Sequence, residues 1–221
     1  MRINVAIDGP TAAGKGTIAK ELAKRLGYQY LDTGAMYRCV AYLSVQNGIS
    51  LDDESEVLRI IKGMDIRFSG NDEVYLNDEN VTKQLRHGNI SLGASDVGKL
   101  LNVRKEMVKQ QQAIAKGKGI VMDGRDIGTV VLPDAEVKIF LTADANTRAE
   151  RRFLENKQKG IETDLEVLKK QIVQRDEQDQ NRINSPLLQA TDALVVDTTD
   201  MTIEEVVDTI EKIIQNKIKE M

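Results

Sequence analysis

Residues 2–26 read RINVAIDGPTAAGKGTIAKELAKRL, and this stretch decides the fold. Its first part, 2–8, is a short apolar run that is typical of a buried strand. Its last part places Ile18, Leu22 and Leu26 at the spacing of one helical face. A glycine-rich segment separates the two. The stretch therefore predicts a strand, a glycine loop and a helix, in that order.

The glycine loop, GPTAAGKGT at 9–17, fits the G-x-x-x-x-G-K pattern of a phosphate-binding loop, or P-loop. In such a loop backbone N–H groups surround the phosphates and the lysine, here Lys15, reaches the β- and γ-phosphates. Its place between a strand and a helix supports the match, because the positive end of a helix also favours an anion. The residues expected to bind the donor phosphates are Gly9, Pro10, Thr11, Ala12, Ala13, Gly14, Lys15, Gly16 and Thr17.

The rest of the chain continues the alternation of strands and helices. Apolar runs predict strands at 28–32, 119–123, 135–143 and 193–199, and helical periodicity predicts helices at 33–48, 99–116, 144–158 and 164–182. A last helix opens with a capping box formed by Thr202 and Glu205. Its apolar stripe comprises Ile203, Val206, Val207, Ile210, Ile213 and Ile214. This order predicts an α/β fold with a five-stranded parallel sheet.

One segment interrupts the alternation. In 65–78 apolar residues alternate around a Gly70-Asn71-Asp72 turn, as in an antiparallel hairpin. Because a hairpin does not belong in a parallel series, we assign 63–97 to an inserted subdomain. The core then comprises 1–62 and 98–221.

The composition argues against several classes of protein. The chain has 221 residues, a formal net charge of -4 and a single cysteine, Cys39. A chain of this length buries a core that needs no disulfide or structural metal. It has no dense run of Lys and Arg and no apolar stretch of about 20 residues. We therefore expect a cytoplasmic protein that binds neither nucleic acid nor membrane.

Two groups of arginines recur at helical spacing. Arg175, Asp179 and Arg182 share one helix face, and they present either two guanidinium groups and a carboxylate to a ligand or a solvated salt-bridge face. A second group comprises Arg148, Arg151 and Arg152, whose like charges repel unless an anion binds.

The GKGT ending of the loop resembles that of nucleoside monophosphate kinases. Three further segments, LDTGAMYR at 31–38, DGRDIGTVVLPDA at 123–135 and RDEQDQNR at 175–182, resemble bacterial cytidylate kinases within that class. A GTP-binding switch is disfavoured, because the chain contains neither D-x-x-G nor N-K-x-D. The resemblance implies a P-loop three-layer sandwich with an inserted nucleotide-binding subdomain at 63–97 and a short helical lid near 144–164.

The same resemblance implies the reaction and the residues that carry it. ATP would donate its γ-phosphoryl group to CMP and also to dCMP, with Mg²⁺ present and a monomer as the working form. The catalytic residues would be Lys15, Arg125, Arg148, Arg151 and Arg152. The CMP phosphate would contact Arg38 and Arg125, the base Thr33, Arg104, Asp126 and Arg182, and the ribose Ser95, Arg175 and Asp179.

The magnesium ligands are less well defined by the sequence. Gly16 stands where the full motif has the serine or threonine that binds magnesium, and Thr17 comes one residue later. Asp123 ends a buried strand, where its carboxylate either orients the water shell of magnesium or caps a loop. We therefore name Thr17 and Asp123 as metal residues, acting directly or through water.

Two other functions stay open at this point. One is a P-loop kinase of another nucleoside monophosphate or of a small-molecule acid, and the other is a non-catalytic ATP-binding regulatory module. The two isolated residues of interest have simpler interpretations, with His87 on the surface of the insert and Cys39 as a packed thiol.

Overall fold

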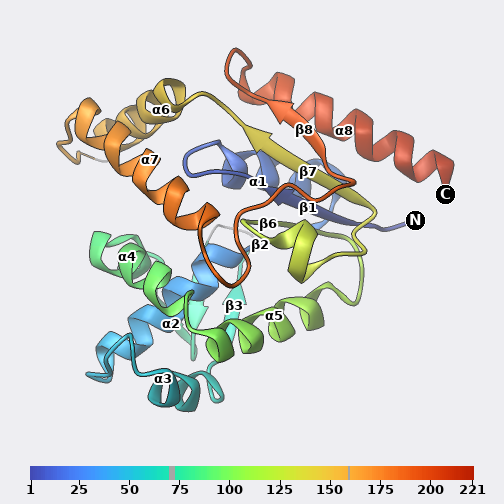
Figure 1. The fold of residues 1–221 in the computed structure, drawn as a ribbon. Coiled ribbons are helices and arrows are strands. Elements are labelled where there is room, and N and C mark those ends of the chain that lie inside the picture. Colours follow the sequence, from blue (N-terminus) through green and yellow to red (C-terminus); the bar gives the residue numbers. More distant parts are fainter. Residues whose placement is uncertain (70–72, 159) are drawn as a thin grey trace. The chain divides into compact units, whose positions relative to one another are not determined.

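The computed structural model describes residues 1–69, 73–158 and 160–221. The chain forms two compact units, one made of Met1–Tyr30 with Ala115–Met221 and the other of Leu31–Ile114 (Figure 1). The first unit contains the glycine loop. The second unit contains the whole segment 63–97, whose role as a nucleotide-binding subdomain stays a prediction.

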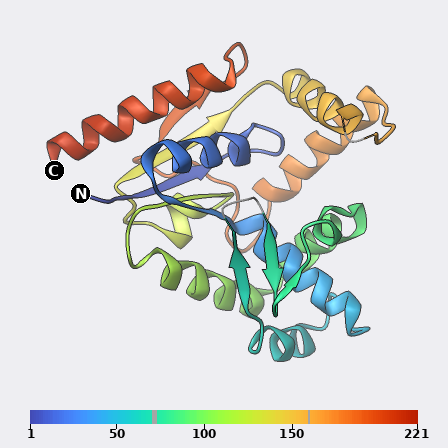
Figure 2. The ribbon, with the colours of Figure 1, turned by 180° about the vertical axis from the view of Figure 1, so that it is seen from behind.

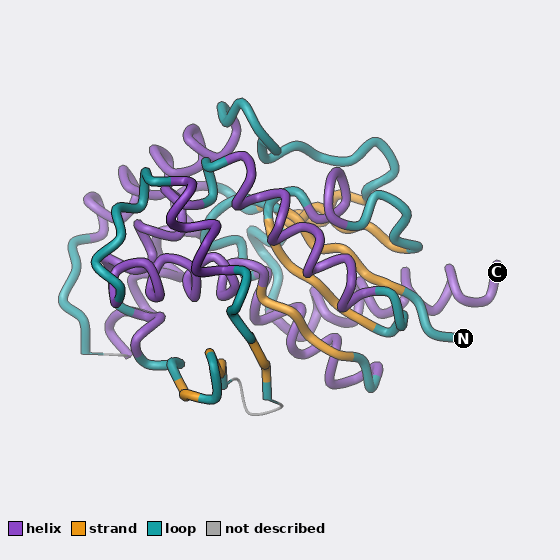
Figure 3. The backbone as a smooth tube through the Cα atoms, turned by 90° about the horizontal axis from the view of Figure 1, so that it is seen from below, coloured by secondary structure: helices purple, strands orange, loops and turns teal. Residues whose placement is uncertain are grey.

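The first unit is built on a five-stranded parallel sheet in the order β2-β6-β1-β7-β8. Figure 3 draws the strands in orange. The strands are β1 (Asn4–Asp8), β2 (Gln29–Asp32), β6 (Ile120–Gly124), β7 (Val137–Thr142) and β8 (Leu194–Asp197). β1 pairs in parallel with β6 and β7, and every residue of β1 and β6 is buried. The predicted fold class is therefore confirmed.

Helices α1 (Lys15–Leu26) and α8 (Ile203–Glu220) lie side by side on one face of this sheet (Figure 2). Both pack their apolar stripes into the main core cluster, which includes Ile7, Ile18, Leu22, Ile139, Leu141, Val207, Ile210 and Ile214. The predicted capping box of Thr202 and Glu205 is confirmed. Ile203 was wrongly assigned to the stripe, since it is 56% exposed in the first helical position, before the helix reaches the core cluster.

Two further helices follow the carboxyl end of β7. They are α6 (Ala145–Gln158) and α7 (Leu165–Gln180), which pack against each other. A short π-helical turn, η2 (Ile127–Val131), follows β6. The loops after β1, β6 and β7 thus emerge at one edge of the sheet, because parallel strands end on the same side.

The last residue of β1 ties two of these loops together. Asp8 is buried, and its carboxylate oxygens accept hydrogen bonds from the backbone N–H groups of Ile127 at 2.8 Å and Gly128 at 2.7 Å. Burial raises the pKa of Asp8 to about 6, and the nearby charge of Asp126 adds to the rise, while the two N–H donors and Lys15 oppose it. The two hydrogen bonds fix the backbone just beyond Arg125 and Asp126.

The second unit is mainly helical. It contains α2 (Thr33–Gln46), α3 (Glu54–Ile61), η1 (Gln84–Arg86), α4 (Gly88–Val97) and most of α5 (Leu101–Ala115). α2 packs closely on α4, where a Cβ on Gly93 would lie 3.2 Å from Cβ of Ala41. Cys39 on α2 is fully buried, which confirms the packed thiol, and burial raises its pKa to about 12.

The second unit also contains the predicted hairpin. β3 (Ile66–Phe68), β4 (Val74–Leu76) and β5 (Glu79–Asn80) form an antiparallel sheet, and β3 and β4 are the two teal arrows in Figure 2. Arg67 on β3 lies opposite Tyr75 on β4. The predicted turn at 70–72 lies outside the described residues. The sequence analysis missed α3, which is short, and α4, whose glycines and serines have low helix propensity. His87 is exposed, as predicted.

We expect Gly9→Ala to destabilise the protein by at least about 2 kcal/mol. Gly9 has a φ of 152°, and a Cβ there would lie 2.1 Å from the carbonyl oxygen of Leu141, so the start of the loop would have to move off β7. Gly63→Ala is the control, because nothing lies within 4 Å of its added Cβ. Urea unfolding of both variants measures the difference, and equal stabilities would contradict the assigned contact.

The raised pKa of Asp8 predicts a pH dependence of stability. Asp8 titrates at about 6 in the folded protein against 3.8 in the unfolded chain, so its contribution is complete below the lower value and is lost as pH rises through the higher one. Measured by urea unfolding, the stability of the wild type relative to Asp8→Asn should fall by about 3 kcal/mol between about pH 3 and 7. A difference that stays constant across this range would remove Asp8 as the cause.

Candidate active site

The glycine loop joins β1 to α1 and has the shape that binds a phosphate. Gly14, the residue before α1, has a φ of 86°, and Ala12 has a φ of 62°. The first turn of α1 has no acidic residue and no side-chain cap, so no side chain caps the N–H groups at the start of the helix. This backbone is suited to an anion.

Lys15 lies at the start of α1 and is only 6% exposed. Its Nζ donates a hydrogen bond to the carbonyl oxygen of Pro10 at 2.7 Å, within the loop itself. Burial lowers the pKa of Lys15, as does the charge of Arg125, and the carboxylates of Asp123 and Asp8 only partly offset the two effects. An anionic ligand beside Lys15 would relieve this cost.

Thr11, in the middle of the loop, is held by three of its polar atoms. Its N–H donates to Oδ1 of Asp176 at 2.9 Å, and its carbonyl oxygen accepts from Nη1 of Arg148 at 2.9 Å. Its hydroxyl oxygen accepts from Nη2 of Arg125 at 3.0 Å. The loop is therefore tied to α6, to α7 and to the segment after β6.

Three arginines surround the carboxylate of Asp179 on α7, and we call them with Asp179 the arginine cluster. Arg125 donates through Nε to Oδ2 of Asp179 at 2.7 Å, and Arg182 pairs with Oδ1. Burial, followed by the charge of Arg125, lowers the pKa of Arg175 to about 10, and its Nε has no hydrogen-bond partner among the described residues. Burial alone would raise the pKa of Asp179, but Arg125 and Arg182 hold it below its usual range.

The structure gives each arginine of the predicted lid its own partner. Arg148, 7% exposed, pairs with Asp176 and donates through Nε to the carbonyl oxygen of Ala143 at 2.9 Å. Arg151 donates to Thr198 Oγ1 at 2.9 Å, and Arg152 pairs with Glu155 at 3.1 Å. The expectation that these arginines need a bound anion to offset their mutual repulsion is therefore wrong, because groups of the protein itself bind each of them.

Asp123 at the end of β6 accepts a hydrogen bond from the hydroxyl of Tyr30 at 2.8 Å. The same hydroxyl lies 3.4 Å from where a Cβ on Gly16 would stand, so Tyr30 adjoins the position where the motif usually carries a hydroxyl. Thr17 is exposed on the first turn of α1. The carboxylate and hydroxyl oxygens of Asp123 and Thr17 suit magnesium chemically.

No group of three or more His, Cys, Asp or Glu in the described ranges could hold a metal ion by itself. One carboxylate, from Asp123, and one hydroxyl, from Thr17, are still enough for Mg²⁺, which usually keeps several waters and takes one or two carboxylates together with substrate phosphates. Asp123 and Thr17 are therefore compatible with a magnesium ion that a bound nucleotide would bring.

The remaining predicted residues lie in the second unit. Arg38 pairs with Asp32 at 2.8 Å, and Asp32 also caps α2 through the N–H of Ala35. The guanidinium of Arg104 lies 5.4 Å from the ring centre of Tyr37, which neighbours Arg38 on α2. Thr33 is buried at the start of α2, and Ser95 is half-buried on α4.

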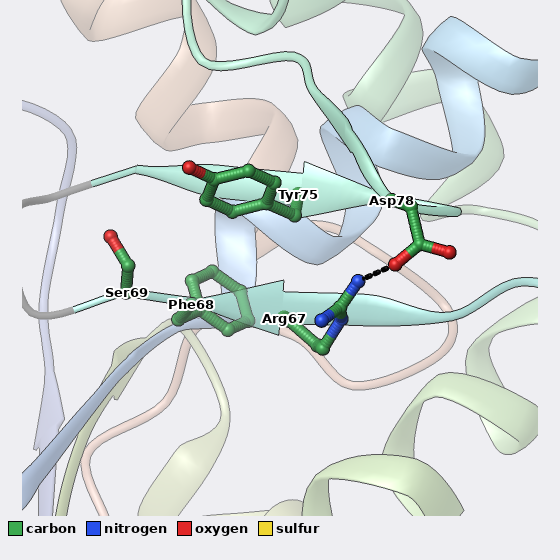
Figure 4. A pocket seen from close by; sticks show the side chains of 5 residues that line it. All are labelled: Arg67, Phe68, Ser69, Tyr75 and Asp78. Carbon is green, nitrogen blue, oxygen red and sulfur yellow. Dashed lines mark hydrogen bonds and ion pairs between the residues drawn. The ribbon is translucent and has the colours of Figure 1, made fainter.

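A hollow of about 480 Å³ in the second unit contains none of the predicted residues. It is lined by the hairpin residues Arg67, Phe68, Ser69, Tyr75 and Asp78 (Figure 4). Arg67 is already paired with Asp78 and Asp65, and these charged side chains are exposed. The charged side chains at the hollow are therefore exposed and already paired with one another, so they give little reason to place a ligand there.

Three residues that the sequence analysis did not name adjoin or contact predicted site residues. Asp8 ends β1, and Asp123 is the last residue but one of β6, so the rule that points to strand ends could have found Asp8. Asp176 follows Arg175, and nothing in its spacing distinguishes it from a surface carboxylate. Tyr30 lies on β2, and the sequence pattern of that segment predicted a strand but no role for the tyrosine.

Comparison with known proteins identifies the family. The family model described as cytidylate kinase matches residues 5–216. A cytidylate kinase of Geobacillus sp. (strain WCH70) is 49% identical over 219 residues, 98% of each chain. One of Streptococcus suis (strain 05ZYH33) is 52% identical over 224 residues, covering 99% of this chain and 97% of the relative.

Solved structures agree on the fold at much lower identity. An uncharacterised protein from Eubacterium ventriosum has a TM-score of 0.55 at 13% identity, over 98% of this chain and 99% of that one. A shikimate kinase from Bacteroides thetaiotaomicron has a TM-score of 0.50 at 13% identity, over 97% and 99%. Among the described helices none is long and apolar enough to cross a membrane. On the strength of the sequence matches, the chain belongs to the cytidylate kinase family.

Proposed function

We propose that this protein transfers the γ-phosphoryl group of ATP to CMP or dCMP, giving ADP and CDP or dCDP. The observation that carries the proposal is the arginine cluster, in which Arg125 and Arg182 pair with the carboxylate of Asp179 and burial beside Arg125 lowers the pKa of the Arg175 guanidinium to about 10. A dianionic phosphate would be favoured beside three guanidinium groups, because charge-assisted hydrogen bonds from arginine to phosphate are strong. The P-loop lies beside this cluster through the bond from Arg125 to Thr11, and family membership indicates cytidine as the nucleoside.

The reaction needs no general base. A phosphate monoester with a second pKa near 6 is largely dianionic at neutral pH, so an oxygen of CMP can attack the γ-phosphorus directly. A bond forms between that oxygen and the γ-phosphorus, while the bond from the γ-phosphorus to the β–γ bridging oxygen breaks and ADP leaves. Catalysis then consists of positioning and charge stabilisation.

The donor and its transferring group would be held by residues of the first unit. Loop N–H groups and Lys15 would bind the β- and γ-phosphates, with Lys15 exchanging its bond to Pro10 for phosphate oxygens. Arg125 would bridge toward the acceptor phosphate. Mg²⁺, when bound, would neutralise phosphate charge, and Asp123 and Thr17 would hold it directly or through water.

The lid arginines have different contacts and therefore different proposed roles. The side chain of Arg152 is 36% exposed, and it could exchange Glu155 for a phosphate oxygen. Arg148 and Arg151 are bound to Asp176 and Thr198, so their contribution to charge stabilisation would require those contacts to change.

The acceptor would be recognised by charge and by hydrogen-bond pattern. Arg38 and Arg125 would bind the phosphate, and Ser95, Arg175 and Asp179 the ribose. Thr33, Arg104, Asp126 and Arg182 would surround the base. Cytosine offers an amino donor to the buried carboxylate of Asp126, whereas uracil would present an oxygen there. We further propose a cytoplasmic monomer that acts on free nucleotides.

An ADP-release assay against a panel of acceptors tests the proposal. We expect turnover with CMP and dCMP, slower turnover with UMP, and background rates with AMP, GMP and shikimate. Turnover with another acceptor in preference to CMP would support a kinase of a different substrate. ATP binding without ADP release for any acceptor would indicate a regulatory module.

Lys15→Met should lower kcat with CMP by about 100- to 1,000-fold, because it removes the charge that stabilises the transferring phosphoryl group. Lys24→Met, on the exposed end of α1, is the matched control for loss of a lysine on the same helix. Unfolding curves show whether both variants keep the fold. A kcat within tenfold of wild type would contradict the role of Lys15.

Asp126→Ala should reduce the preference for CMP over UMP by about 1–3 kcal/mol in kcat/KM. The loss falls on CMP because only its amino group donates to the carboxylate. The measurement is kcat/KM for both nucleotides in the same enzyme preparation. Equal losses on both would assign Asp126 a role outside base recognition.

A further inference from the structure

Arg125 is held in one orientation by two different elements. Its Nε bonds to Asp179 on α7 at 2.7 Å, and its Nη2 bonds to the hydroxyl of Thr11 in the P-loop at 3.0 Å. A third, longer contact runs from Nη1 to the carbonyl oxygen of Gly124 at 3.4 Å. A guanidinium has five N–H donors, so these contacts leave one N–H on each terminal nitrogen for a bidentate bond to a phosphate.

The hydroxyl of Thr11 can direct Arg125 because the rest of Thr11 is fixed independently. Asp176 accepts from its N–H, and Arg148 donates to its carbonyl oxygen. Thr11 is also buried, at 5% exposure. A change at the hydroxyl alone would therefore leave the backbone of the loop in place and alter only the contact to Arg125.

We propose that Thr11, a residue of the donor loop, is a positioning residue for the acceptor phosphate, acting through the hydrogen bond from Arg125 to its hydroxyl. The inference rests on the proposed function, in which Arg125 binds the phosphate of CMP. It separates two roles within one loop: the backbone and Lys15 serve ATP, and the Thr11 hydroxyl serves CMP. Affinity for the acceptor then depends on a side chain of the donor site.

The test is Thr11→Val, which has nearly the same shape and lacks the hydroxyl. We expect KM for CMP to rise about tenfold, from the loss of a hydrogen bond to a charged group, while KM for ATP stays within twofold. Calorimetric titration of CMP into the nucleotide-free protein should show the same loss. Thr11→Ser should restore CMP affinity, because it returns the hydroxyl.

A double-mutant cycle with Arg125→Ala tests whether Thr11 acts through Arg125. In the Arg125→Ala background, Thr11→Val should cause no further loss of CMP affinity. An undiminished loss there, a rise in KM for ATP without one for CMP, or no restoration by Thr11→Ser would each overturn the proposal.

The wild-type acceptor assay distinguishes failure of this inference from failure of the proposed function. If the wild type does not phosphorylate CMP, the proposed function fails, and the role of Thr11 fails with it. If the wild type is active on CMP and Thr11→Val leaves KM for CMP unchanged, only the Thr11 inference fails.

Discussion

The candidate active site depends on buried, positively charged side chains whose orientation is fixed by neighbouring carboxylates. Lys15 and Arg148 are almost fully buried, and Arg125 is largely buried. Such charges lose their hydration and repel one another, so they are stable only where carboxylates compensate them. Asp179 does so for Arg125 and Asp176 for Arg148 through direct bonds, while Lys15 donates to the carbonyl oxygen of Pro10. The cations are therefore oriented before any substrate binds, which reduces the reorganisation that catalysis would require.

The backbone makes this arrangement possible by bringing the loops together at one edge of the sheet. Gly9 lies so close to the carbonyl of Leu141 that a side chain would displace the loop from β7. Asp8, one residue earlier, holds the backbone after β6 through two N–H groups. Asp8 and Gly9, at the end of β1, thus set the positions of the glycine loop and of the segment that carries Arg125.

Much of the fold could be predicted from the sequence because it follows from local patterns. Apolar runs located the strands of the parallel sheet, and Thr202 with Glu205 located the start of α8. The P-loop was predictable because its motif is contiguous. α3 was missed because its apolar pattern covers barely two turns, and α4 because its glycines and serines favour other conformations.

The partners of the site residues were not predictable in the same way. Helical spacing placed Arg148, Arg151 and Arg152 together, which implied repulsion between them. In the structure each arginine has a different partner. Arg148 pairs with Asp176 from another helix, Arg151 donates to Thr198, which follows β8, and Arg152 pairs with Glu155 one turn later. Such contacts depend on tertiary packing. The resemblance to a family named the residues, while their bonds to Thr11 had to come from the structure.

The buried thiol of Cys39 can be used to measure how often the helices of the second unit separate. It is the only cysteine in the sequence, its side chain is fully buried on α2, and its pKa is raised to about 12. A thiol in that state does not react with alkylating reagents, since the thiolate is the nucleophile. The rate of its alkylation would therefore follow the population of molecules in which the helices around Cys39 have separated. Comparing that rate with and without CMP would measure how much the acceptor stabilises this unit, without any label being added to the chain.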